Sequence, residues 1–201
     1  MRDHLLQWLE TGTKDSNSEG LNNSIRIANF IGVLFTTVIG IPFIVVTFIY
    51  LRPLSWVPVA GTAMFLMVIA FNYTELYRLS RVVLCTVPLL LANIYSAYLL
   101  NAGQDLPQSL AFIIGSFVVM PMALFEWHDR KYAIALGIIG AAMMLLLPYY
   151  ESWFQLDYPL DLSIFEAGPL RIIVSLMALT ANSGMMLTLV YRNSVLENKW
   201  L

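Results

Sequence analysis

One short segment, residues 125–131, carries the densest chemistry in the chain and reads Phe-Glu-Trp-His-Asp-Arg-Lys. Glu126, His128 and Asp129 are residue types that bind metal ions or exchange protons. No second cluster of this kind occurs in the sequence, so we expect neither a metal site nor a catalytic site. The segment is more typical of a tight turn closed by local ion pairs. Such a turn can also contact a cytoplasmic domain, which makes these three residues and Arg130 candidates for signal coupling.

A second set of candidates consists of neutral polar and aromatic side chains. Asn29, Asn93 and Asn182 lie in long apolar segments, where an amide either hydrogen-bonds to a neighbouring helix or contacts a ligand. Trp153 and Tyr158 belong to a connection with four acidic residues. These aromatic side chains could cover a pocket or lie flat on lipid headgroups. We take all five as candidate ligand-binding residues.

The composition places these residues in a membrane protein. The 201 residues are 59% hydrophobic and only 12% charged, with a mean hydropathy of +0.71, whereas soluble domains have about 25% charged residues. The formal net charge of −2 gives no indication of nucleic-acid binding. The single cysteine, Cys85, can form neither an internal disulfide nor a structural zinc site.

Six apolar segments are candidates for membrane-spanning helices. A helix needs about 20 apolar residues to cross a hydrocarbon core of about 30 Å. The segments are residues 27–50, 57–73, 82–100, 110–125, 132–150 and 172–191. We therefore expect an all-α membrane protein, a bundle of six transmembrane helices. The second and fourth segments are short, so their ends are the least certain.

The basic residues predict the orientation of this bundle. With a cytoplasmic N-terminus, nine of the eleven lysines and arginines fall on the cytoplasmic side, and only Arg52 and Arg171 on the other. The cytoplasmic set is Arg2, Lys14, Arg26, Arg78, Arg81, Arg130, Lys131, Arg192 and Lys199. By the positive-inside rule, both termini are then cytoplasmic.

The ends of the chain flank the bundle, which we assign to residues 25–192. Residues 1–24 are expected to be a cytoplasmic segment: a short amphipathic helix or a frayed tail, stopped at Gly12, then a polar linker over residues 13–24. Neither Pro nor Gly interrupts residues 185–201, so the last helix can continue into the cytoplasm. Residues 193–201 are then the start of a signalling helix, with Arg192 and Glu197 as further candidates for signal coupling, or an ordinary frayed terminus.

Several activities lack the residues that they need. The two histidines, His4 and His128, and all three lysines lie outside the predicted spans, which argues against a buried haem or a retinal Schiff base. All charged residues can be placed at span ends or in connections, which argues against an ion-coupled transporter. We expect no cofactor, no metal and no enzymatic activity in this chain.

Five features resemble a known group of membrane domains. They are Asn29, which follows a short polar lead and opens the first span, residues 71–84 (FNYTELYRLSRVVL), Asn93 in the following span, residues 121–136 (PMALFEWHDRKYAIAL) and residues 191–201 (YRNSVLENKWL). In order and spacing, they are similar to the six-span N-terminal regions of bacterial histidine kinases and class III adenylate cyclases. The resemblance implies a homodimer in the bacterial inner membrane whose exit helices pair and drive an effector domain. No such domain is present in this sequence.

Three hypotheses follow for the function. The first is a receptor or sensor module that transmits a signal through its last helix, with a lipophilic ligand or a property of the bilayer as the stimulus. The second is an accessory or scaffolding subunit of a larger membrane complex. The third is a transporter of a neutral or lipophilic solute.

Overall fold

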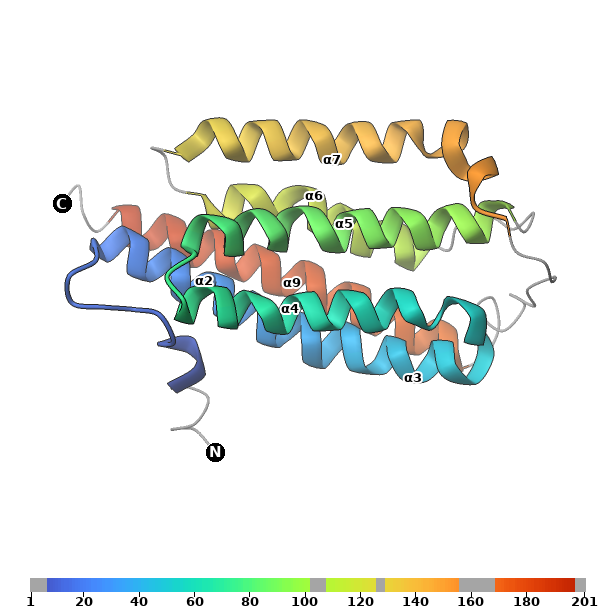
Figure 1. The fold of residues 1–201 in the computed structure, drawn as a ribbon, viewed down its shortest axis with the longest axis horizontal. Helices are drawn as coiled ribbons and strands as arrows, with labels where there is room; N and C mark the ends of the chain where they lie inside the picture. Colours follow the sequence, from blue (N-terminus) through green and yellow to red (C-terminus); the bar gives the residue numbers. More distant parts are fainter. Residues whose placement is uncertain (1–6, 102–107, 126–128, 156–168, 198–201) are drawn as a thin grey trace.

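The computed structural model describes residues 7–101, 108–125, 129–155 and 169–197, and within these ranges it contains helices and no strand. The helices lie side by side along one long axis (Figure 1). Their bounds are α2 (Glu19–Phe35), η1 (Thr36–Gly40), α3 (Ile41–Tyr50), η2 (Arg52–Leu54), α4 (Trp56–Tyr73), α5 (Tyr77–Asn101), α6 (Gln108–Leu124), α7 (Arg130–Tyr150), η4 (Glu151–Trp153) and α9 (Pro169–Glu197).

Five helical segments are long and apolar enough to cross a membrane. They are Glu19–Tyr50, Arg52–Tyr73, Tyr77–Asn101, Arg130–Tyr149 and Arg171–Val190. The remaining predicted span corresponds to α6, whose apolar part, Ala111–Leu124, is shorter. The expectation of an all-α, multi-pass membrane protein is therefore confirmed. The number of six spans and the side on which each end lies stay predictions.

The first span contains one wide turn. In η1 the Ile41 N–H donates to the Thr36 carbonyl oxygen five residues back, which makes this turn a π-helix. Pro42 follows immediately and has no N–H, and its ring would clash with the carbonyl of residue 38 in a regular α-helix. The wide turn absorbs this clash, so the span continues into α3 without a break.

The first span approaches α4 closely because it carries small residues every fourth position. Ala28, Gly32, Thr36 and Gly40 are all buried. A Cβ at Gly32 would lie 2.9 Å from the Phe65 carbonyl oxygen, and one at Gly40 would overlap the Thr62 side chain. Small residues at such contacts are how helices associate in lipid, where the hydrophobic effect between helices is absent.

Aromatic rings fill the centre of the bundle behind this contact. Phe35 packs edge-on against Phe65 and Phe117, with ring centroids 5.5 Å apart in both pairs. These three rings come from the first span, α4 and α6, so they join helices that are far apart in the sequence. Edge-to-face pairs of this kind add about 0.5–1.5 kcal/mol each beyond the apolar area that they bury.

The predicted linker over residues 13–24 is wrong in its second half. α2 begins at Glu19, where the Ser18 side chain accepts a hydrogen bond from the Leu21 N–H and caps the helix. The polar residues after Ser18 therefore form the first turns of the helix rather than a connection. The predicted stop at Gly12 is confirmed: residues 7–9 are helical, and Gly12 has a φ of 89°.

The last helix, α9, is continuous from Pro169 to Glu197. Its 29 residues extend over about 43 Å at about 1.5 Å per residue. α9 packs against α6, α2 and η1, and a Cβ at Gly184 would overlap the Leu34 side chain of α2. The expected uninterrupted last helix is thus present as far as Glu197.

The contact at Gly40 leads to a first prediction. Alanine favours a helix over glycine by about 1 kcal/mol, so Gly115→Ala, where a Cβ meets nothing within 4 Å, should leave the melting temperature of the detergent-solubilised protein unchanged or higher. Gly40→Ala should lower it, because the Thr62 Cβ is itself too near to be relieved by rotation of that side chain. Equal melting temperatures for both variants would contradict the close contact.

Candidate functional site

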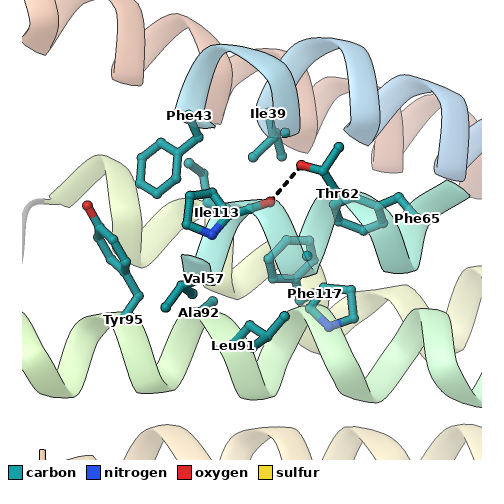
Figure 2. Close-up of a pocket in the computed structure, with 14 residues that line it drawn as sticks. Ile39, Phe43, Val57, Thr62, Phe65, Leu91, Ala92, Tyr95, Ile113 and Phe117 are labelled. Carbon is teal, nitrogen blue, oxygen red and sulfur yellow. Dashed lines mark hydrogen bonds between the residues drawn. The ribbon is translucent and has the colours of Figure 1, made fainter. Parts of the chain in front are cut away.

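An apolar cavity of about 70 Å³ lies between the first span, α4, α5 and α6. Ile39 and Phe43 bound it on the side of the first span, as Figure 2 shows, with Thr62, Phe65, Phe117 and Tyr95 around it. Its full lining is Ile39, Gly40, Phe43, Val57, Pro58, Gly61, Thr62, Phe65, Pro88, Leu91, Ala92, Tyr95, Ile113 and Phe117.

Among the described residues that line the cavity, Thr62 and Tyr95 have polar side chains. The Thr62 hydroxyl donates to the Pro58 carbonyl oxygen at 2.7 Å (Figure 2), so its single O–H donor is already used within α4. The Tyr95 side chain is only 2% exposed, and its hydroxyl has no hydrogen-bond partner in the part of the chain that the structure describes. Buried hydroxyls are rarely left in this state.

One wall of the cavity also contacts α9. Ile39 and Gly40 belong to the wide turn η1, which lines the cavity and packs against both α4 and α9. A change in the volume or occupancy of the cavity therefore acts on an element that touches the last helix. Single π-helical turns inside α-helices are frequent at functional sites.

A second polar region lies at the end of the bundle where α2 and α7 begin and α4 joins α5 (Figure 1). We call it the basic end, because six of the described basic residues gather there: Lys14, Arg26, Arg78, Arg81, Arg130 and Lys131. This grouping agrees with the charge asymmetry expected from the sequence.

Arg81 is the buried member of this set, at 4% exposure. Its Nε donates to the Tyr77 carbonyl oxygen at 3.2 Å, and its Nη1 lies 4.0 Å from Asp129 Oδ2. The guanidinium stands over the Phe125 ring, 5.3 Å from the centroid. Arg81 therefore ties the start of α5 to the end of α6 and the start of α7.

Asn29 holds the N-terminal segment onto the basic end. Its Nδ2 donates to the carbonyl oxygens of Leu9 and Thr11 at 3.1 and 2.9 Å, with that of Trp8 at 3.3 Å. Its Oδ1 accepts from Asn72 Nδ2 of α4 at 2.7 Å. One buried amide thus binds the carbonyls at the end of the N-terminal helical turn, of which that of Trp8 also accepts from the Thr11 N–H.

Residues 10–14 of the N-terminal segment are held by a hydrogen bond to the Gly12 backbone and by two ion pairs. The Gly12 carbonyl oxygen accepts from the Tyr77 hydroxyl at 3.0 Å, and a Cβ at Gly12 would overlap the Asn72 carbonyl. The Arg26 Nε donates to both Glu10 carboxylate oxygens at 2.9 and 3.0 Å, and Lys14 pairs with Glu75.

These ion pairs shift the pKa values of their members in opposite directions. The hydrogen bond from Arg26 lowers the pKa of the Glu10 carboxyl, so this pair stabilises the segment above the ordinary pKa of glutamate and is lost as the pH falls. The hydrogen bond to Glu75 raises the pKa of the Lys14 ammonium, so the stabilisation that depends on the charge of Lys14 is lost as the pH rises through the raised value. Both pairs are therefore intact near neutral pH.

The candidate ligand-binding residues do not gather at the cavity, because its lining includes none of them. Asn29 lies at the basic end. Asn93 is buried in α5 and donates to the Leu89 carbonyl oxygen. Asn182 of α9 donates to the carbonyl oxygens of Phe112 in α6 and Ala178. Trp153 is 80% exposed, and Tyr158 lies outside the described residues.

The candidates for signal coupling are placed only in part. Asp129 is near Arg81, as described above, and Arg130 is exposed at the start of α7. Glu126 and His128 lie outside the described residues. Arg192 and Glu197 fall within α9. Among the described residues, no group of three or more His, Cys, Asp and Glu is placed to hold a metal ion.

Two residues with structural importance were not singled out from the sequence. Arg81 was counted as a residue of the connection before the third span, although no Gly or Pro separates it from the apolar run that follows. That continuity was the available signal that it begins a helix and can be buried. For Tyr95 the sequence carries no comparable signal, since its unpaired hydroxyl results from how four helices meet.

The fold and these sites define a helical membrane bundle with an internal apolar cavity and a polar, clamped end. Comparison with known proteins does not narrow this class further: no family model, no curated protein and no solved structure matches the chain.

The Asn29 contacts lead to a second prediction. Asn29→Leu should release the N-terminal segment, because it leaves the Leu9 and Thr11 carbonyls and the Asn72 amide without their shared partner, at about 1–3 kcal/mol for each buried group. Hydrogen exchange of residues 8–14, followed by mass spectrometry, should become faster. Asn182→Leu is the matched control and should leave that exchange unchanged. Unaltered protection in Asn29→Leu would contradict the assigned role.

A third prediction concerns Arg81. Arg81→Ala leaves Asp129 without this cation and Phe125 without its stacking partner. Because Asp129 is partly exposed and 4.0 Å away, the cost should be smaller than the value of about 3–5 kcal/mol for a fully buried pair. The melting temperature should fall, and Arg81→Lys should recover it only in part, because an ammonium cannot reproduce the planar stacking. Arg78→Ala, an exposed position three residues earlier, should have almost no effect. A similar loss in both alanine variants would rule out a specific clamp.

Proposed function

We propose that this chain is a membrane-embedded sensor module that transmits a change within the bundle to the cytoplasm through α9, as a homodimer. The observation that carries the proposal is the continuity of α9 over 29 residues. Its length of about 43 Å exceeds a hydrocarbon core of about 30 Å by more than two turns. A helix that crosses the bundle and leaves it unbroken can pass on a shift or a rotation.

The packing of α9 supports this proposal. α9 contacts η1, α2 and α6, and the Gly184–Leu34 contact allows no gap between α9 and the first span. Because η1 also lines the cavity, a rearrangement there reaches α9 through a single layer of contacts. Packed helices of this kind respond by discrete shifts rather than by continuous deformation.

The environment of the sensor follows from the basic end. If this end faces the cytoplasm, as the positive-inside rule favours, the end of α9 that carries Arg192 and Glu197 enters the cytoplasm. Together with the resemblance described above, this supports a place in the bacterial inner membrane and a kinase or cyclase domain as the effector. The stimulus would be a lipophilic ligand or a property of the bilayer.

A fourth prediction tests transmission through α9. The full chain is fused in frame to a cytoplasmic catalytic domain whose activity depends on the pairing of two entering helices. One to seven alanines are then inserted between Val195 and Leu196. Because each added residue turns the helix by about 100°, the output should vary about fivefold or more with the helical period and recover at seven insertions.

A flexible linker provides the control for this series. A Gly-Ser linker placed between Leu201 and the catalytic domain should abolish the periodic dependence. An output that is the same for every insertion would contradict the sensor proposal. Purification in mild detergent then distinguishes the alternatives: a homodimer supports the sensor, and stoichiometric co-purification with other subunits supports a scaffolding role.

A further inference from the structure

The shape of the cavity restricts what can bind there. Its lining runs along α4 from Val57 to Phe65 and along α5 from Pro88 to Tyr95, which corresponds to about 10–12 Å of helix length. The volume is only about 70 Å³, whereas an enclosed apolar cavity that binds benzene has about 150 Å³. The space is therefore a slot too narrow for a ring, but it is open on one side, so it suits part of an unbranched chain whose remainder extends out of the cavity.

The polarity of the slot restricts the ligand further. None of the described residues that line it is acidic or basic, so a charged group would be buried without a partner of opposite charge, which is strongly unfavourable. The Thr62 hydroxyl is already bonded to the Pro58 carbonyl. An ionised carboxylate or an ammonium group is thus excluded as the part of a ligand that enters this space.

Among the described lining residues, Tyr95 supplies the one side-chain hydrogen-bond donor that remains available. It stands at one end of the slot beside Phe43 (Figure 2), with the two ring centroids 5.1 Å apart, while Phe65 and Phe117 lie toward the other end. Its hydroxyl has no partner among the described residues, and it can both donate and accept a hydrogen bond. The Thr36 hydroxyl is also unpaired but does not line the cavity.

We infer that this cavity is a binding site for an unbranched aliphatic molecule with one uncharged hydrogen-bonding group, such as a fatty alcohol. The polar group binds the Tyr95 hydroxyl, and the chain extends along α4 and α5 toward Phe117. As the identity of the stimulus, this inference rests on the proposed sensor function, although binding itself can be measured without any output. The bound aliphatic chain has two potential sources, a free lipophilic molecule or the acyl chain of a bilayer lipid.

Photolabelling of the full-length chain tests this inference. The protein is reconstituted in nanodiscs of diphytanoyl phosphatidylcholine, whose branched chains do not supply an unbranched one. The probe is a ten-carbon primary alcohol with a diazirine at mid-chain. We expect labelled peptides from α4 and α5, and loss of the label with excess 1-decanol. Cyclododecanol and ionised decanoate should not compete.

Variants of the lining separate specific binding from partition into the bilayer. Gly61→Leu and Ala92→Leu both fill the slot, and either variant that keeps the wild-type melting behaviour should lose the label. Tyr95→Phe should weaken competition by 1-decanol about threefold to tenfold, the effect of one hydrogen bond, without lowering the melting temperature. Tyr98→Phe is the matched control, since Tyr98 packs on Phe154 outside the cavity, and it should bind as the wild type does.

A change of the nanodisc lipid identifies the source of the bound aliphatic chain. In dioleoyl phosphatidylcholine, an affinity for 1-decanol about tenfold lower supports the site and assigns it to a lipid acyl chain. An unchanged affinity supports the site and assigns it to a free molecule.

Three results would overturn the inference: label on lipid-facing residues that 1-decanol does not remove, unchanged label in a folded slot-filling variant, or equal affinity of Tyr95→Phe and wild type. The sensor proposal has a separate readout. If the alcohol does not bind but the output still varies periodically with the number of inserted alanines, α9 transmits a signal that comes from another stimulus. If the alcohol binds but the output is the same for every insertion, the cavity is a ligand site in a protein that does not signal.

Discussion

The close approach of the first span to α4 is the constraint on which the rest of the bundle depends. In lipid, apolar side chains gain nothing by leaving the solvent for one another, so helices associate where their backbones can come near. Gly32 faces a backbone carbonyl and Gly40 faces Thr62, which leaves no room for larger residues. With this pair of helices fixed, Phe35 meets Phe65 and Phe117 at the centre, and α9 can pack on the outside of the first span.

The same constraint explains why the cavity exists. The first span touches α4 at Gly40 but carries the larger Ile39 and Phe43 on either side, so the two helices cannot close over the whole length between them. Pro88 adds to this on α5, because a proline inside a helix prevents regular packing along that face. The cavity is thus a consequence of packing small residues next to large ones, at a position where the helix is already wound irregularly.

The sequence alone predicts the helices well and the sites poorly. Continuous apolar runs predict the helices, although α2 begins at Glu19, eight residues before the predicted first span, and Gly12 marks a helix end by its freedom to take a positive φ. The cap at Ser18 is hard to predict because the polar residues that follow it are typical of a linker. The three asparagines were grouped by residue type, yet each finds its hydrogen bonds at a different place. Arg81 and Tyr95 depend on which helices meet around them, and no local pattern encodes that.

The wide turn at Thr36–Gly40 also sets the rotational phase of the first span. A π-helical turn holds one residue more than the α-helical turn that it replaces. Deletion of that residue would restore a regular helix but rotate everything after it by about 100°, and Phe43 would then leave the cavity wall. The extra residue therefore determines which face α3, the part of this span after Gly40, presents to the neighbouring helices.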